Sequence, residues 1–141
     1  MSRFIQFDYV RFKKGSAPII PVEVRGKRHW HKVWCYVDSG AYYSVLRPDV
    51  AKHLKVDELT PRQVLVTTSG GRSQSIKLYR LAAKIGSWQG VVTFGVPHGF
   101  DIDFNLLGRK NVFNEFAITF DDSKNVVTFK PHKPKPVRRK K

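Results

Sequence analysis

Apolar and polar residues alternate along most of the chain, which is the pattern of half-buried β-strands. A repeat of 3.6 residues, typical of amphipathic helices, is rare. The segments expected to form strands are rich in β-branched and aromatic residues and are separated by turn residues. They are residues 4–12, 19–25, 30–37, 63–68, 75–83, 91–96, 117–120 and 126–129.

Two short helices and several turns are expected between these strands. Pro48 suits the first position of a helix, and Asp49 suits its first turn. A second short helix is expected from Asn111 to Phe116. Gly70-Gly71 lies between two expected strands and predicts the tip of a hairpin. Many short strands with few helical segments predict a mainly β fold, either a closed barrel or a sandwich.

The composition suits one folded domain without disulfides. A chain of 141 residues can bury a core of its own. Cys35 is the only cysteine, so neither an internal disulfide nor a cysteine zinc site is expected. The N-terminus lacks the apolar region of a secretory signal, and no run reaches the roughly 18 apolar residues of a membrane span. We therefore expect a soluble, cytoplasmic protein.

No cofactor or metal site is expected. Phosphate-binding loops, nucleophile elbows and HExxH motifs are absent from the sequence. His29 and His31 lie two positions apart on an expected strand, so they share a face. Without a suitably spaced cysteine or carboxylate, we interpret them as surface histidines rather than metal ligands.

Positive charge is concentrated at the C-terminus. The chain has a net charge of +15, and residues 130–141 contain seven of its 26 Lys and Arg residues and no acid. We expect a folded domain over residues 1–129, followed by a flexible basic tail over 130–141. Such a tail binds nucleic acid or another polyanion through phosphate contacts, or only keeps the protein soluble. The sequence leaves both interpretations open.

Three features that carry chemistry follow one another in a fixed order. Asp38-Ser39-Gly40-Ala41 comes directly after an expected strand, Ser69-Gly70-Gly71 forms the hairpin tip, and Leu106-Leu107-Gly108-Arg109 precedes an expected helix. Asp-Ser-Gly alone is a common turn sequence. The three features together resemble the retropepsin-like aspartic proteases over residues 17–129, and the cellular and prokaryotic members more than the viral ones.

The resemblance implies a closed retropepsin-like β-barrel or sandwich and an aspartic endopeptidase that acts on peptides or proteins. It assigns the catalytic carboxylate to Asp38. It assigns support of the active-site loop to Ser39, Gly40 and Ala41. It assigns a flap that covers the substrate to Ser69, Gly70 and Gly71. It assigns packing behind the loop to Leu107, Gly108 and Arg109. Carboxylate-catalysed peptide hydrolysis needs two carboxyl groups that share a proton. Because the chain has one such motif, a homodimer is implied.

One position departs from the viral pattern, and a second function stays open. Viral members carry an acid two residues after the loop glycine, where it pairs with the arginine of the Gly-Arg segment. Tyr42 stands there, so Arg109 lacks the expected acid. The alternative function is a catalytically silent or gated protease-like dimer that binds nucleic acid or another polyanion through Lys130 to Lys141. The intact Asp-Ser-Gly favours the enzyme.

Overall fold

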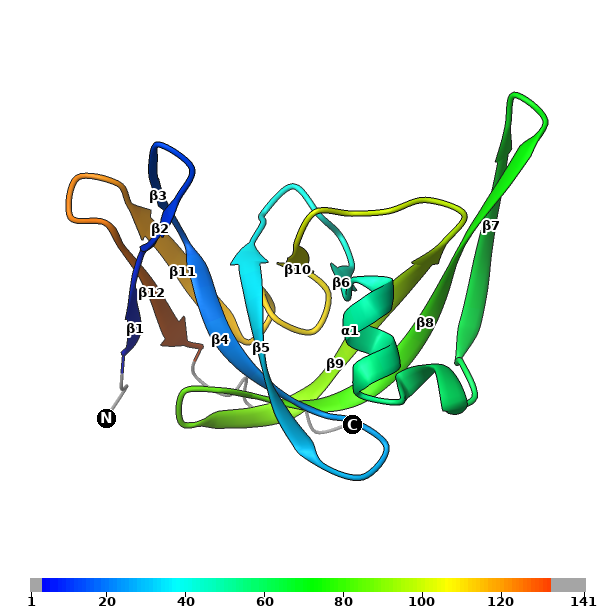
Figure 1. Cartoon of the computed structure of the whole chain (residues 1–141). Coiled ribbons are helices and arrows are strands. Elements are labelled where there is room, and N and C mark those ends of the chain that lie inside the picture. The colour runs from blue at the N-terminus through cyan, green and yellow to red at the C-terminus, as the bar shows by residue number, and fades with distance from the viewer. Residues whose placement is uncertain (1–3, 133–141) are drawn as a thin grey trace, which may run out of the picture.

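A computed structural model describes residues 4–132 and shows a β-barrel with a smaller sheet and a projecting hairpin (Figure 1). Two short helices lie between the strands, the α-helix α1 (Pro48–His53) and the 3₁₀ helix η1 (Val56–Glu58). The strands are β1 (Ile5–Asp8), β2 (Val10–Phe12), β3 (Gly15–Ala17), β4 (Ile19–Arg25), β5 (Trp30–Val37), β6 (Ser44–Val45), β7 (Gln63–Ser69), β8 (Arg72–Ile85), β9 (Trp88–His98), β10 (Asn105–Leu107), β11 (Phe116–Asp121) and β12 (Val126–Pro131).

Six strands close the barrel in the order β4-β5-β10-β6-β9-β8. The ring closes because β4 also pairs with β8, where Glu23 is opposite Lys84 and Val24 is opposite Ala83. Alternate side chains of each strand point inward, as the period of two requires. On β5, for example, Val33, Cys35 and Val37 are buried. The closed mainly β fold expected from the sequence is therefore confirmed.

The longest strand, β8, belongs to both the barrel and the projecting hairpin. Its C-terminal part pairs with β9 along the barrel wall, and its N-terminal part pairs with β7. Figure 1 shows the β7–β8 hairpin in green, extending well beyond the barrel. The hairpin expected around Gly70-Gly71 is present, with both strands longer than the alternation predicted.

The three-stranded sheet β1-β12-β11 packs against the barrel through aromatic side chains. Phe116 and Phe129 are fully buried and meet edge to face, with ring centroids 5.5 Å apart. Phe7 packs on Phe129, and Trp88 of β9 packs on Phe116, with centroids 5.9 and 5.3 Å apart. These contacts join the smaller sheet and the barrel into one core.

The single strand expected over residues 4–12 is wrong, because the chain turns at Tyr9. The backbone N–H of Tyr9 donates to Asn125 O at 2.7 Å, and its hydroxyl donates to Asp122 Oδ1 at 2.7 Å. The chain therefore leaves the three-stranded sheet after β1 and forms a separate ribbon, β2–β3. Burial and the Asp122 hydrogen bond raise the pKa of Tyr9 to about 12.

The helix expected from Asn111 to Phe116 is also wrong, because this segment forms turns and Phe116 begins β11. Asn111 has φ 67°, a left-handed conformation that ends a right-handed helix. Its Oδ1 accepts a hydrogen bond of 3.0 Å from the backbone N–H of Thr93, so a contact with β9 fixes the turn.

The ends of the described chain differ slightly from expectation. Strand β12 continues to Pro131, so Lys130 and Pro131 belong to the sheet rather than to the tail. Residues 133–141, which hold the rest of the expected tail, lie outside the described residues. Within residues 4–132, no helix has the length and apolarity needed to cross a membrane.

Candidate active site

The loop that carries Asp38 connects β5 to β6, and β10 lies between these two strands. Strand β10 runs parallel to β5, with Leu107 opposite Val37, and antiparallel to β6, with Leu106 opposite Val45. A strand from much later in the sequence therefore separates the two ends of the loop (Figure 1). This arrangement fixes the start and the end of the loop through backbone hydrogen bonds.

Asp38 is half-buried and held by three backbone contacts. Its N–H donates to Leu107 O at 3.0 Å, and its carbonyl accepts from Ala41 N at 3.3 Å. Its Oδ1 accepts from the N–H of Gly40 at 2.8 Å. Among residues 4–132, Oδ2 has no hydrogen-bond partner, and Ser39 and Gly40 beside it are exposed. One carboxylate oxygen is therefore fixed, and the other is available for chemistry.

The segment after β10 forms the back of the loop. The N–H of Gly108 donates to Ser44 Oγ at 3.0 Å, and the N–H of Arg109 donates to Ala41 O at 2.9 Å. A Cβ added at Gly108 would lie 2.5 Å from the carbonyl oxygen of Tyr43. Only glycine allows this approach, because real Cβ atoms do not come so close to backbone atoms. The structure thus brings Leu107, Gly108 and Arg109 together with the Asp38 loop.

Tyr42 and Arg109 contact each other in place of an ion pair. The guanidinium carbon of Arg109 lies 5.6 Å from the centroid of the Tyr42 ring, and Lys110 Nζ lies 5.8 Å from it. Neither of the two ion pairs within residues 4–132 includes Arg109. An aromatic face that attracts both cations therefore occupies the position where viral members have an acid.

The tip of the β7–β8 hairpin is a tight turn that stands free of the loop. Gly70 and Gly71 have φ of 59° and 74°, as a two-residue turn of this kind requires. Apart from the neighbouring residues of the turn, no atom of residues 4–132 lies within 4 Å of a Cβ built on either glycine. Farther along the hairpin, Val64 and Val66 are 45% and 65% exposed. The turn at Gly70 and Gly71 is therefore open, and Asp38 is not among the residues beside it.

Two buried polar residues that the sequence analysis missed stabilise the site. Ser44 is fully buried and accepts the hydrogen bond from Gly108. Asn105 accepts from the N–H of Arg47 at 2.8 Å and donates to Trp34 O at 3.0 Å, so it connects β10 to β5 and to the start of α1. Each is a polar residue directly before two apolar ones. A polar residue beside a buried apolar pair was the available sign in the sequence of a buried hydrogen bond.

An aromatic cluster flanks the loop. Tyr36 lies two residues before Asp38 on β5, and its ring stacks on Phe104 with centroids 5.3 Å apart. Phe12, at the end of β2, contacts Phe104 edge to face with centroids 5.7 Å apart. All three rings are only partly buried, so they present apolar surface beside the loop.

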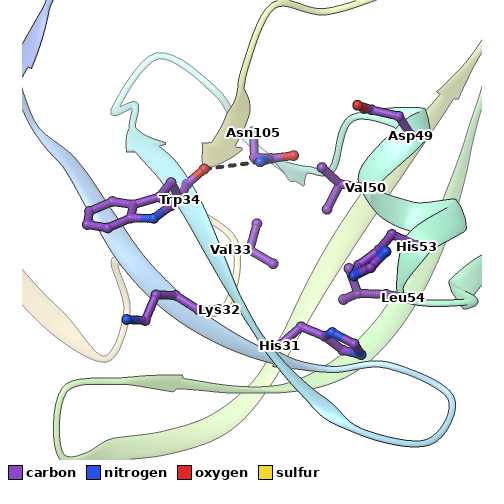
Figure 2. A pocket seen from close by; sticks show the side chains of 9 residues that line it. All are labelled: His31, Lys32, Val33, Trp34, Asp49, Val50, His53, Leu54 and Asn105. Atoms are coloured by element: carbon purple, nitrogen blue, oxygen red, sulfur yellow. Dashed lines mark hydrogen bonds between the residues drawn. The ribbon is translucent and has the colours of Figure 1, made fainter.

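A separate cavity of about 440 Å³ lies between β5 and α1 (Figure 2). The rings of His31 and His53, which line it, have centroids 5.4 Å apart. The ring of His29, which does not line it, lies 6.3 Å from that of His31. Across residues 4–132, no three His, Cys, Asp or Glu side chains are arranged to hold a metal ion. Figure 2 also shows the hydrogen bond from Asn105 to Trp34 at the upper end of this cavity.

Cys35 offers no alternative nucleophile. It lies on β5, three residues before Asp38, but its side chain is fully buried inside the barrel. Burial raises the pKa of its thiol to about 12, so the thiolate does not form near neutral pH. The carboxylate of Asp38, directly after β5, is by contrast only half-buried.

Comparison with known proteins is consistent with this geometry. A family model described as aspartyl protease matches residues 20–109. The structure is similar to a retropepsin-like aspartic protease from Rickettsia conorii, with TM-score 0.65 and 18% identity over 93% of this chain and 94% of that chain. It is also similar to the retroviral protease-like domain of Ddi1 from Leishmania major, with TM-score 0.57 and 19% identity over 84% and 94%. Comparison with curated proteins gave no match.

Proposed function

Since the chain belongs to the retropepsin-like branch of the aspartyl protease family, we propose that it is an endopeptidase active as a homodimer, with Asp38 from each copy forming the catalytic pair. The observation that carries the proposal is the state of Asp38. Its Oδ1 is fixed by the N–H of Gly40, and within residues 4–132 its Oδ2 has no hydrogen-bond partner and lies beside exposed residues of the loop. One chain supplies one such carboxylate, so the second comes from a second copy.

Two carboxyl groups at the dimer axis provide both an acid and a base. Like charges a few ångströms apart cannot both ionise, so the pair holds one shared proton. The ionised carboxylate takes a proton from a water molecule, and the water oxygen attacks the carbonyl carbon of the peptide bond. The protonated carboxyl group donates its proton to the carbonyl oxygen. The carboxyl group that received the proton from water then protonates the amine nitrogen, and the C–N bond breaks. A hydroxyl of the tetrahedral intermediate returns its proton to the other carboxylate as the carbonyl re-forms, which restores the pair with one shared proton.

The surrounding residues have supporting roles in this proposal. Ser39 is exposed beside Asp38, where its hydroxyl would meet the loop of the other copy. The β7–β8 hairpin acts as a flap that closes over the peptide with Ser69, Gly70 and Gly71 and excludes water. An extended substrate forms main-chain hydrogen bonds with strand edges. The rings of Tyr36 and Phe104 then favour apolar side chains near the cleaved bond.

The proposal is tested by cleavage of a diverse peptide library between pH 4 and 7 with micromolar protein. We expect Asp38→Asn to lower kcat/KM by about 10²–10⁴-fold or more, because the variant loses general acid–base catalysis. Asp57→Asn removes the same charge from an exposed residue of η1 and should cleave as the wild type does. Undiminished cleavage by Asp38→Asn would exclude this mechanism.

Polyanion binding through Lys130 to Lys141 has less support. Only residues 130–132 of that segment are described, and two of them belong to β12. The Nζ of Lys130 lies 5.8 Å from the centroid of the Phe4 ring rather than in a cluster of free cations. No observation on the described residues favours a nucleic acid as partner, so the protease is the function proposed.

A further inference from the structure

A polar cavity of about 290 Å³ lies beside the catalytic loop and has no assigned role. Three basic side chains, Arg62, Arg80 and Lys110, line it. Four hydrogen-bonding side chains and one apolar residue complete the lining, and they are Tyr43, Gln63, Thr93, Asn111 and Leu78. No carboxylate lines the cavity, so its charge is positive.

None of the three cations forms an ion pair with a described residue. The ion pairs within residues 4–132 join Lys27 to Glu58 and Arg47 to Asp49, and neither involves a residue of the cavity. Like charges gathered without a counter-ion repel one another, and a bound anion relieves that repulsion. The cavity therefore has the chemistry of a site for a carboxylate or a phosphate.

The walls of the cavity come from the two parts of the site that would hold a substrate. Arg80 and Thr93 are opposite each other on β8 and β9, and Arg62 precedes β7 at the base of the hairpin. On the other side, the N–H of Lys110 donates to Tyr42 O at 2.7 Å, so this wall is attached to the Asp38 loop. The cavity thus lies between the base of the proposed flap and the catalytic loop.

Its distance from Asp38 is within reach of a bound peptide. Tyr43 lies five residues after Asp38, so their Cα atoms are at most roughly 18 Å apart. Six residues of an extended peptide span roughly 20 Å. An extended peptide is therefore long enough to span from Asp38 to the cavity within about six residues of the cleaved bond.

We propose that this cavity binds an acidic side chain of the substrate. Arg62, Arg80 and Lys110 then select peptides that carry a carboxylate at one particular position, remote from the cleaved bond. The proposal rests on the protease function above. The contact is remote from the reacting atoms, so it strengthens binding of substrate and transition state alike and acts mainly on KM.

The anion site is tested first without reference to catalysis, by titrating inorganic sulfate into the full-length protein and following backbone amide NMR signals. We expect the largest shifts at Thr93, Lys110 and Asn111, and binding weakened about tenfold or more in Arg80→Gln. Arg25→Gln removes the same charge from the far end of β4 and should bind sulfate as the wild type does. Shifts spread evenly over the surface, or an unchanged affinity in Arg80→Gln, would overturn the proposal.

The origin of the anion is tested with pairs of peptides that carry Glu or Gln at each position up to six residues from the cleaved bond. We expect one position where Glu, compared with Gln, raises kcat/KM by about tenfold by lowering KM. This ratio should fall to about one in Arg80→Gln and persist in Arg25→Gln. Sulfate binding without a preference for Glu would mean a site for free anions and would contradict the proposal. Failure to cleave any peptide would instead contradict the protease function, while the sulfate titration still decides the anion site.

Discussion

At Gly108, the segment after β10 passes in van der Waals contact with the Asp38 loop. We expect Gly108→Ala to lower the free energy of unfolding by about 1–3 kcal/mol, because the new Cβ meets the backbone oxygens of Tyr43 and Ala41, which cannot move independently. Peptide cleavage should fall as well, since the loop must shift. Urea unfolding and kcat/KM give the two quantities.

The matched control is Gly15→Ala, at the start of β3. In the described part of the chain, no atom beyond its sequence neighbours lies within 4 Å of a Cβ at Gly15. This substitution should therefore leave the free energy of unfolding unchanged or raise it by about 0.4–1 kcal/mol. Equal effects of the two substitutions would show that close packing at Gly108 does not hold the loop.

At the scale of the element, the β7–β8 hairpin depends on its own turn rather than on the barrel. Gly71→Val places a β-branched residue at φ 74°, which costs about 1–2 kcal/mol. This cost falls on the hairpin, because no described atom outside the turn lies within 4 Å of a Cβ at this position. We expect faster amide hydrogen exchange in β7 with unchanged exchange in β5, and a lower kcat/KM. Gly71→Asn should largely preserve the exchange rates in β7 and kcat/KM, because asparagine tolerates this backbone conformation. Faster exchange throughout the barrel would contradict a local role.

The elements that local signals specify were predicted well. Strands 19–25 and 30–37 and the start of α1 at Pro48 agree with the structure, because alternation and proline at the first helical position act over a few residues. The expected helix at Asn111 to Phe116 was wrong, because a hydrogen bond to β9 decides the conformation of Asn111.

The residues of the site also divide into those that local motifs reveal and those that depend on contacts between distant segments. Asp38 and Gly108 belong to short motifs and were visible in the sequence. The roles of Ser44 and Asn105 depend on the insertion of β10 between β5 and β6, and no local pattern reveals that pairing. The cationic cavity was missed for the same reason, since Arg62, Arg80 and Lys110 are brought together only by the fold.

At the scale of the whole molecule, the proposed mechanism makes activity a property of pairs of chains. The test mixes wild-type and Asp38→Asn chains in equal amounts and lets the dimers re-equilibrate. Random pairing then places half of the wild-type chains in dimers that have only one Asp38 carboxylate. We expect the activity of the wild-type chains to fall to about half. Asp57→Asn added in the same way should not reduce it. Activity that is independent of the added Asp38→Asn chains would indicate that a single chain is sufficient.

The hydrogen bonds between the Asp38 loop and residues 107–109 also have a consequence for biosynthesis. The N–H of Asp38 donates to Leu107 O, and Ala41 O accepts from the N–H of Arg109. A ribosome adds Asp38 and Ala41 about 70 residues before these partners. Domains fold as units during synthesis, so the loop cannot take its final geometry in the emerging chain. Under the proposed mechanism, the nascent polypeptide is therefore inactive until translation has passed Arg109.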